Sequence, residues 1–172
     1  METSLTYVLG HRPYRIGGGI QEMSIFKSPS WIQVSTRKKF ILNLNNYRTG
    51  HYRILNKAKI EYKEFMKEQI LKYKKKLNKV CIIYTVYQPT RRRFDVGNVC
   101  SIHQKFFEDA LVELGRLEDD KYNFIPMSVF CFGGISPDNP RVDIEVIEYN
   151  SSFFTKLHNR LDKIIKRLYT KE

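Results

Sequence analysis

The chain has 172 residues, of which 42% are hydrophobic, so it is long enough for one domain with a substantial core. Its net charge of +12 is uneven, because residues 1–90 hold 17 Lys and Arg against 5 Asp and Glu, whereas residues 91–172 hold 13 of each. No apolar run approaches the roughly 20 residues that span a bilayer, and the first residues lack the order of a signal peptide. Composition therefore favours a protein that binds polyanions and argues against a membrane protein.

The three cysteines, Cys81, Cys100 and Cys131, are widely spaced and odd in number. They form no CxxC pair near a histidine, so neither a zinc site nor a disulfide framework is expected. This pattern indicates reduced core cysteines in a cytoplasmic protein.

The periodicity of apolar residues predicts one α+β domain, with a mixed sheet flanked by helices. Residues 1–36 are expected to form an N-terminal extension that packs on the core, and residues 37–172 to form the domain. An alternating stretch at 39–44 runs into the polar sequence LNLNNYRTGHYR, which is interpreted as a loop. The remaining elements are expected as follows in chain order: helix 56–77, strand 80–87, helix 98–114, strand 123–131, a turn at GGISPDNP, strand 141–148 and helix 152–169.

Three arginines, Arg91–Arg93, directly precede Asp95, and two adjacent acids, Asp119 and Asp120, follow the next helix. Arginines can hold phosphates, whereas carboxylates from separate elements can bind a divalent metal. Lys105, on the intervening helix, could neutralise a pentacovalent phosphate or orient an attacking water. The combination predicts a metal-dependent nuclease, with Asp95 and the pair Asp119–Asp120 converging on one site.

The order of these motifs resembles that of the RusA-type Holliday-junction resolvases. The matching pieces are RRRFDVGN, Lys105, DAL at 109–111, Gly115 and the pair Asp119–Asp120, and NLNNYRTGHYR resembles the family's Asn- and Tyr-rich loop. The resemblance implies a homodimer that cuts four-way junctions with Mg²⁺ or Mn²⁺. It also implies that Asp95 and Asp120 bind the metal and that Lys105 is the catalytic lysine. The expected DNA contacts are Arg91, Arg92, Arg93, Asn46, Tyr47, Arg48, Tyr52 and Arg53.

Two departures from the family pattern concern the metal site. Gly97 stands where the family has its second aspartate, and the following helix is longer by about one turn. The candidates to replace the missing carboxylate are Asn98, Glu108 and Asp109, and Asp119 is a further candidate metal ligand.

The sequence thus predicts a magnesium-dependent endonuclease that resolves branched DNA, acting as a homodimer in a bacterial or phage-infected cytoplasm. Neither a membrane nor a small-molecule cofactor is expected. Two alternatives stay open. One is a non-catalytic DNA-binding protein on the same scaffold. The other is an RNA-binding module whose Tyr47, Tyr52 and arginines stack on bases.

Overall fold

The computed structural model of the chain describes residues 25–150 and 152–169, which form a single α+β domain with a mixed sheet and four helices. The central strand is β4 (Val80–Gln88), which pairs in parallel with β5 (Met127–Ile135) and antiparallel with β6 (Arg141–Glu148). β1 (Ile25–Pro29) pairs antiparallel with β6 and gives the order β1-β6-β4-β5. A separate hairpin joins β2 (Trp31–Ser35) to β3 (Lys38–Ile41).

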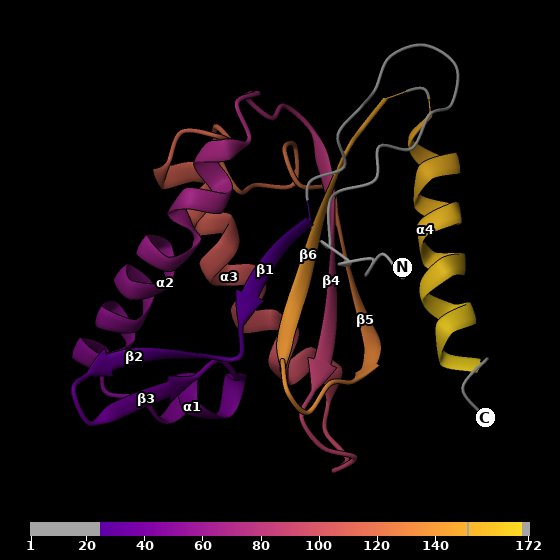
Figure 1. Cartoon of the computed structure of the whole chain (residues 1–172). Coiled ribbons are helices and arrows are strands. Elements are labelled where there is room, and N and C mark those ends of the chain that lie inside the picture. The colour runs from indigo at the N-terminus through magenta and orange to yellow at the C-terminus, as the bar shows by residue number, and fades with distance from the viewer. Residues whose placement is uncertain (1–24, 151, 170–172) are drawn as a thin grey trace, which may run out of the picture.

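Helices cover both faces of the four-stranded sheet (Figure 1). α2 (Tyr52–Lys72) and α3 (Val96–Glu113) lie on one face, and α4 (Phe153–Tyr169) lies on the other. β4 is apolar along most of its length, which suits a strand that is buried on both faces. Ile82 and Tyr84 face the larger core beneath α2 and α3, whereas Cys81 and Ile83 face the smaller core beneath α4.

The helices reach these cores through ordinary helical spacing. α2 buries Ala58, Tyr62, Met66 and Ile70, one residue per turn, and leaves its lysines and glutamates in solvent. The turn that terminates α3 contains Gly115, which has φ of 67°. The Arg116 N–H donates to the Leu111 carbonyl at 2.8 Å, so the left-handed residue and this bond close the helix as a Schellman motif.

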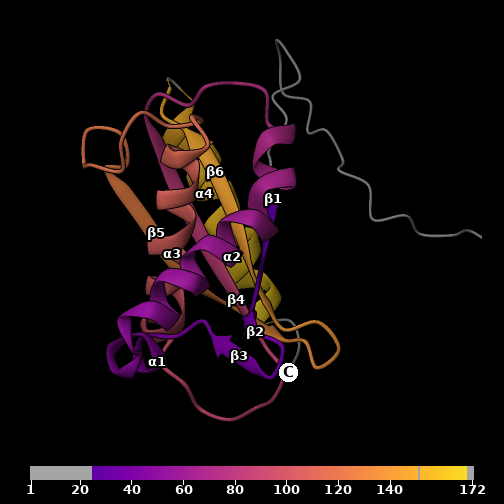
Figure 2. The same cartoon turned by 90° about the vertical axis from the view of Figure 1, so that its left-hand side faces the viewer.

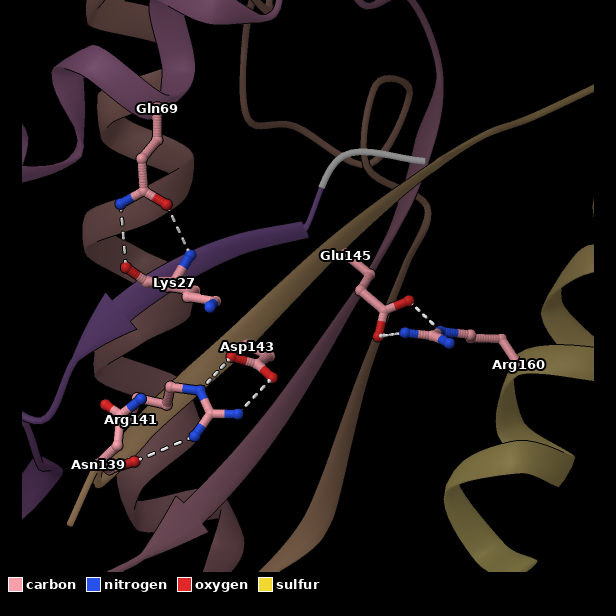
Figure 3. Close-up of polar contacts among 7 residues, drawn as sticks. All are labelled: Lys27, Gln69, Asn139, Arg141, Asp143, Glu145 and Arg160. Carbon is pink, nitrogen blue, oxygen red and sulfur yellow. Dashed lines mark hydrogen bonds and ion pairs between the residues drawn. The ribbon is translucent and has the colours of Figure 1, made fainter. Parts of the chain in front are cut away.

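Polar side chains fix two outer elements of the domain (Figure 3). Gln69 of α2 accepts a hydrogen bond from the Lys27 N–H at 2.8 Å and donates one to the Lys27 carbonyl at 3.1 Å, which occupies the free edge of β1. On the opposite face, Arg160 of α4 forms a two-pronged ion pair with Glu145 of β6, and its Nη2 lies 2.6 Å from Oε1. The bonds of Gln69 satisfy backbone groups at the edge of β1, and the Arg160–Glu145 pair holds α4 against the sheet.

The strands predicted at 80–87 and 141–148, and the helices predicted at 98–114 and 152–169, are confirmed to within two residues. The prediction that residues 1–36 form an extension is wrong for the part that the structure describes. Residues 25–29 are an integral strand of the sheet, and residues 31–35 form half of the hairpin. Residues 1–24 lie outside the described part.

Two further differences have local causes. The polar segment interpreted as a loop contains α1 (Leu44–Thr49), because the Asn43 side chain accepts a bond from the Asn46 N–H at 2.8 Å and caps a short helix. β5 begins later than predicted and continues through Gly133, where a turn was expected. Gly133 is the extra residue of a bulge, and a Cβ there would lie 2.6 Å from the Tyr87 ring.

Candidate nucleic-acid interface

Asn98 joins two segments that are far apart in the sequence. Its Oδ1 accepts a hydrogen bond from the Leu44 N–H at 3.1 Å, and its Nδ2 donates to Asn45 Oδ1 at 3.1 Å. Tyr47 of the same short helix packs edge-on against Phe106 of α3, with ring centroids 6.2 Å apart. The Asn- and Tyr-rich segment and the arginine run therefore reach one end of the molecule.

That end is strongly basic. Figures 1 and 2 show the β2–β3 hairpin, α1 and the loop that follows β4 together at the lower edge of the fold. Residues 36–54 and 89–98 contain eight cations and a single acid, Asp95. None of the eight forms an ion pair with an acid in the described part of the chain. We call this set the basic end; its members are Arg37, Lys38, Lys39, Arg48, Arg53, Arg91, Arg92 and Arg93.

Exposed aromatic rings accompany these cations. Lys39 Nζ lies 3.8 Å from the centre of the Trp31 ring, and the Arg53 guanidinium lies 5.7 Å from the Tyr52 ring. His51 caps α2 and stacks on Tyr52, with ring centroids 4.6 Å apart. A shallow groove of about 430 Å³ runs between the hairpin and the start of α2, lined among others by Lys38, Lys39 and His51. Cations beside flat apolar rings suit a ligand that carries both phosphates and bases.

Asp95 sits within the basic end as the N-cap of α3. Its Oδ1 accepts from the Gly97 N–H at 2.8 Å, and its side chain is exposed. Capping explains why an acid stands at this position, since the first N–H groups of a helix have no partner within it. The carboxylate lies among cations that would hold a phosphate chain.

Asp119 and Asp120 lie at the other end of α3, so the expected convergence of Asp95 with Asp120 is wrong within one copy of the chain. Asp120 is close enough to Glu108 to help raise its pKa, and Glu108 is separated from Asp95 by 13 residues of helix. At 1.5 Å per residue this is roughly 20 Å. Asp119 forms an ion pair with Lys121 at 2.6 Å, which lowers the pKa of its carboxyl.

The other candidates on α3 are also separated from Asp95. Asp109 faces α2 and pairs with Lys59 at 3.1 Å, which gives this acid a structural role. Lys105 is exposed and, among the described residues, forms no ion pair. It stands ten residues beyond Asp95, or about 15 Å along the helix. Asn98 alone lies within one turn of Asp95, where its side chain is used to hold α1.

Glu108 is the most perturbed acid of the described chain. It is buried, and burial raises the pKa of its carboxyl to about 7. Tyr84 Oη donates to Glu108 Oε1 at 3.1 Å, and Ser128 Oγ donates to the same oxygen at 3.3 Å. The sequence suggested Glu108 only as a substitute metal ligand, whereas its carboxyl is buried and bonded to Tyr84 and Ser128.

Sequence reasoning also missed part of the basic end. Arg37, Lys38, Lys39 and Trp31 fell on or beside the supposed extension, where no chemistry was expected. The run RKK before an alternating stretch was the signal that could have found them. His103, predicted to be a core residue, is confirmed as fully buried, and its Nδ1 lies 2.7 Å from Ser28 Oγ.

Among the described residues, no three His, Cys, Asp or Glu side chains come together where they could hold a metal. The described helices include none that is long and apolar enough to cross a membrane. The sequence matches no protein-family model and no curated protein.

Proposed function

We propose that this protein binds branched DNA through its basic end. The observation that carries the proposal is the gathering of eight cations without ion-pair partners from three separate segments of the described chain. Solvated cations that face one way are costly to bring together, since they repel one another, and a polyanion relieves that repulsion. Lysines elsewhere on the described surface are largely balanced, as in the pair Lys57–Glu61.

The resemblance to RusA-type resolvases supports a branched form of DNA as the target. The first two motifs of the resemblance are NLNNYRTGHYR and RRRFDVGN, and both supply cations to the basic end. A four-way junction has two-fold symmetry, which suits a homodimer with one basic end on each subunit. The described cysteines are free thiols, which supports placement in the cytoplasm.

Cutting of that DNA is the second candidate, and the position of Asp95 favours it. One oxygen of Asp95 caps α3, and the exposed carboxylate also lies among cations that would hold phosphates, where it could take part in chemistry on them. A metal held there would supply a hydroxide nucleophile and neutralise the leaving oxygen. Asp95 alone does not make such a site, so this candidate needs further carboxylates from outside the basic end.

The binding proposal is tested by salt dependence on a four-way junction, a linear duplex and single-stranded RNA. Replacing Arg91, Arg92 and Arg93 by alanine should reduce the slope of log affinity against log salt by up to about 0.9 for each phosphate that is no longer neutralised. The matched control replaces Lys72, Lys74 and Lys76, which carry the same charge at the far end of α2, roughly 30 Å away.

The proposal predicts a smaller slope for the arginine variant only, together with preference for the junction. Equal slopes for both variants would exclude the basic end as the DNA-binding surface. Tighter binding of single-stranded RNA than of either DNA would favour the RNA-binding alternative, in which Trp31 and Tyr52 stack on bases. Addition of Mg²⁺ or Mn²⁺ in the same assay tests for cutting.

A further inference from the structure

A second hollow, of about 560 Å³, borders β2, whereas the groove of the basic end borders β3. The end of β1, the middle of α2 and the turn between β5 and β6 form its other walls (Figure 2). Trp31 and Phe65 both line this hollow, and they are 41% and 52% exposed. We call it the aromatic pocket, and its two rings suit a flat ligand group with apolar faces.

Lys39 connects the aromatic pocket to the basic end. Its Nζ lies 3.8 Å from the centre of the Trp31 ring, and Lys39 also lines the groove on β3. The two hollows therefore meet at the contact between these two residues. A nucleotide whose phosphate is bound by Lys39 has its base within reach of Trp31, because only the sugar separates phosphate from base.

The two hollows carry charge of opposite sign. The groove is lined by Lys38 and Lys39 and by no acid of the described chain. The aromatic pocket is lined by three acids, Glu61, Glu64 and Asp138, against two cations. Phosphates are therefore attracted to the groove and repelled from the pocket, which leaves the pocket to the uncharged base.

The polar groups of the aromatic pocket can accept hydrogen bonds from a base. Of its cations, Arg141 is already bound, since its Nε donates to Asp143 Oδ1 at 2.7 Å and its Nη1 to the Asn139 carbonyl at 3.1 Å (Figure 3). Glu61 and Glu64 each pair with one lysine of α2, and an ionised carboxylate has further lone pairs. Adenine, cytosine and guanine carry an exocyclic amino group that can donate to such oxygens, whereas thymine carries none.

We propose that the aromatic pocket binds one unpaired base of the DNA strand that the basic end holds. Trp31 and Phe65 pack on the base, and Glu61 and Glu64 accept hydrogen bonds from its amino group. An unpaired base is the fitting ligand, because a base inside a duplex must first be unstacked and unpaired at a cost in free energy. This inference rests on the proposed DNA binding, and it narrows the target to branched DNA with an unpaired adenine, cytosine or guanine beside the branch.

The fluorescence of Trp31 tests the pocket directly, because this is the only tryptophan of the chain. Three four-way junctions are compared: one is fully paired, one has an unpaired cytosine at the branch, and one has an abasic residue in place of that cytosine. The unpaired cytosine should quench Trp31 emission and bind about tenfold more tightly than the abasic residue. The abasic junction should bind like the paired one and leave the emission nearly unchanged.

Phe65→Ala keeps the reporter and should lose the tenfold gain, while its affinity for the fully paired junction stays that of the wild type. The control, Leu71→Ala, changes another exposed apolar residue of α2 and should keep the gain. Trp31→Phe retains a ring and should keep most of the gain, whereas Trp31→Ala should lose it. Circular dichroism of each variant separates loss of base binding from loss of folding.

The carboxylates are tested by exchanging the unpaired cytosine for thymine. The wild type should prefer cytosine several-fold, and Glu61→Gln with Glu64→Gln should bring the ratio of the two affinities close to one. This ratio cancels the general gain in DNA affinity that follows from removing two negative charges. A ratio that the double variant leaves unchanged would exclude these two carboxylates from base recognition.

Two failures can be told apart. A protein that binds the paired junction but shows neither quenching nor a gain for the unpaired cytosine overturns the aromatic pocket and leaves the proposed DNA binding standing. A gain that Phe65→Ala and Trp31→Ala both retain also overturns it, because the base then binds elsewhere. A protein that binds none of the three junctions overturns both proposals, and quenching by single-stranded RNA alone would assign the pocket to RNA instead.

Discussion

Arg160 of α4 and Glu145 of β6 meet between the sheet and the helix that covers its second face, where Glu145 is almost fully buried. Two guanidinium nitrogens face the two carboxylate oxygens, which is the arrangement that best compensates burial of both charges. Breaking such a pair from one side leaves an uncompensated charge, which costs more than the pair itself contributes. α4 is therefore held by an ion pair that tolerates removal of both partners better than removal of one.

Arg160→Met should lower the free energy of unfolding by about 3 kcal/mol, because Glu145 stays buried without a cation. Adding Glu145→Gln should return part of that stability, since the remaining amide carries no charge. The control is Lys166→Met, which removes an exposed pair with Asp162 and should cost under about 0.5 kcal/mol. Urea unfolding of the three variants measures the differences. A destabilisation in Arg160→Met no larger than in the control would contradict this role for the pair.

Glu108→Gln should alter the dependence of stability on pH. Glu108 keeps its proton in the folded state up to about pH 7, whereas the unfolded carboxyl ionises above its ordinary pKa of 4.5. The unfolded state therefore binds fewer protons between these values, and this contribution to stability falls as pH rises through the window. The variant should match the wild type near pH 4 and exceed it at pH 8 by up to about 3 kcal/mol, at 1.36 kcal/mol per unit.

His103 has the opposite effect on the pH dependence of stability. Only the difference in stability between variant and wild type therefore isolates the contribution of Glu108. Burial lowers the pKa of His103 to about 3, and its contribution to stability disappears as pH falls from 6.5 towards that value. Thermal unfolding of both proteins from pH 4 to 8 provides the comparison. A constant difference across this range would show that Glu108 does not titrate near neutrality.

Asn98→Ala should loosen α1 from α3. It removes the acceptor for the Leu44 N–H and the donor to Asn45, which should cost about 1–2 kcal/mol. Binding to a four-way junction should weaken as well, because the two halves of the basic end are no longer held together. The control, Asn56→Ala, changes an exposed asparagine of α2. Equal junction affinity for both variants would mean that the Asn98 hydrogen bonds do not shape the interface.

Gln69→Ala should expose the edge of β1. It removes two hydrogen bonds to the Lys27 backbone, which should cost about 1–2 kcal/mol in unfolding measurements. Gln69→Glu can still accept from the Lys27 N–H but cannot donate to the Lys27 carbonyl, so it should be intermediate near pH 8. If Gln69→Glu were as stable as the wild type, the bond to the carbonyl would contribute nothing.

The central strand and the main helices could be predicted because their patterns are local. The buried residues of α2 recur once per turn, and β4 is apolar along most of its length. The edge strand β1 was missed because its pairing with β6 joins residues more than a hundred positions apart. No period in the sequence reports such a pairing.

The candidate site was likewise predicted only where its residues are close in the sequence. The arginine run and Asp95 were found because they are adjacent in sequence, and Asn98 joins their segment to the Asn-rich one. The pairing of Asp95 with Asp120 was not found within one copy, since a helix of 18 residues keeps its two ends apart. The order of the motifs in the sequence does not show that the helix between them places Asp95 and Asp120 at opposite ends.

The position of Glu145 bears on how the chain avoids aggregation before α4 covers the sheet. All strands of the sheet precede α4 in the sequence, so the face with Cys81, Ile83 and Ile147 can form before α4 docks on it. During that interval an apolar surface is open to aggregation and to chaperones. Glu145 places a solvated charge in the middle of this surface, where it hinders the docking of foreign apolar segments. Only a segment that brings a cation to the right place, as α4 brings Arg160, can cover the face without burying an unpaired charge.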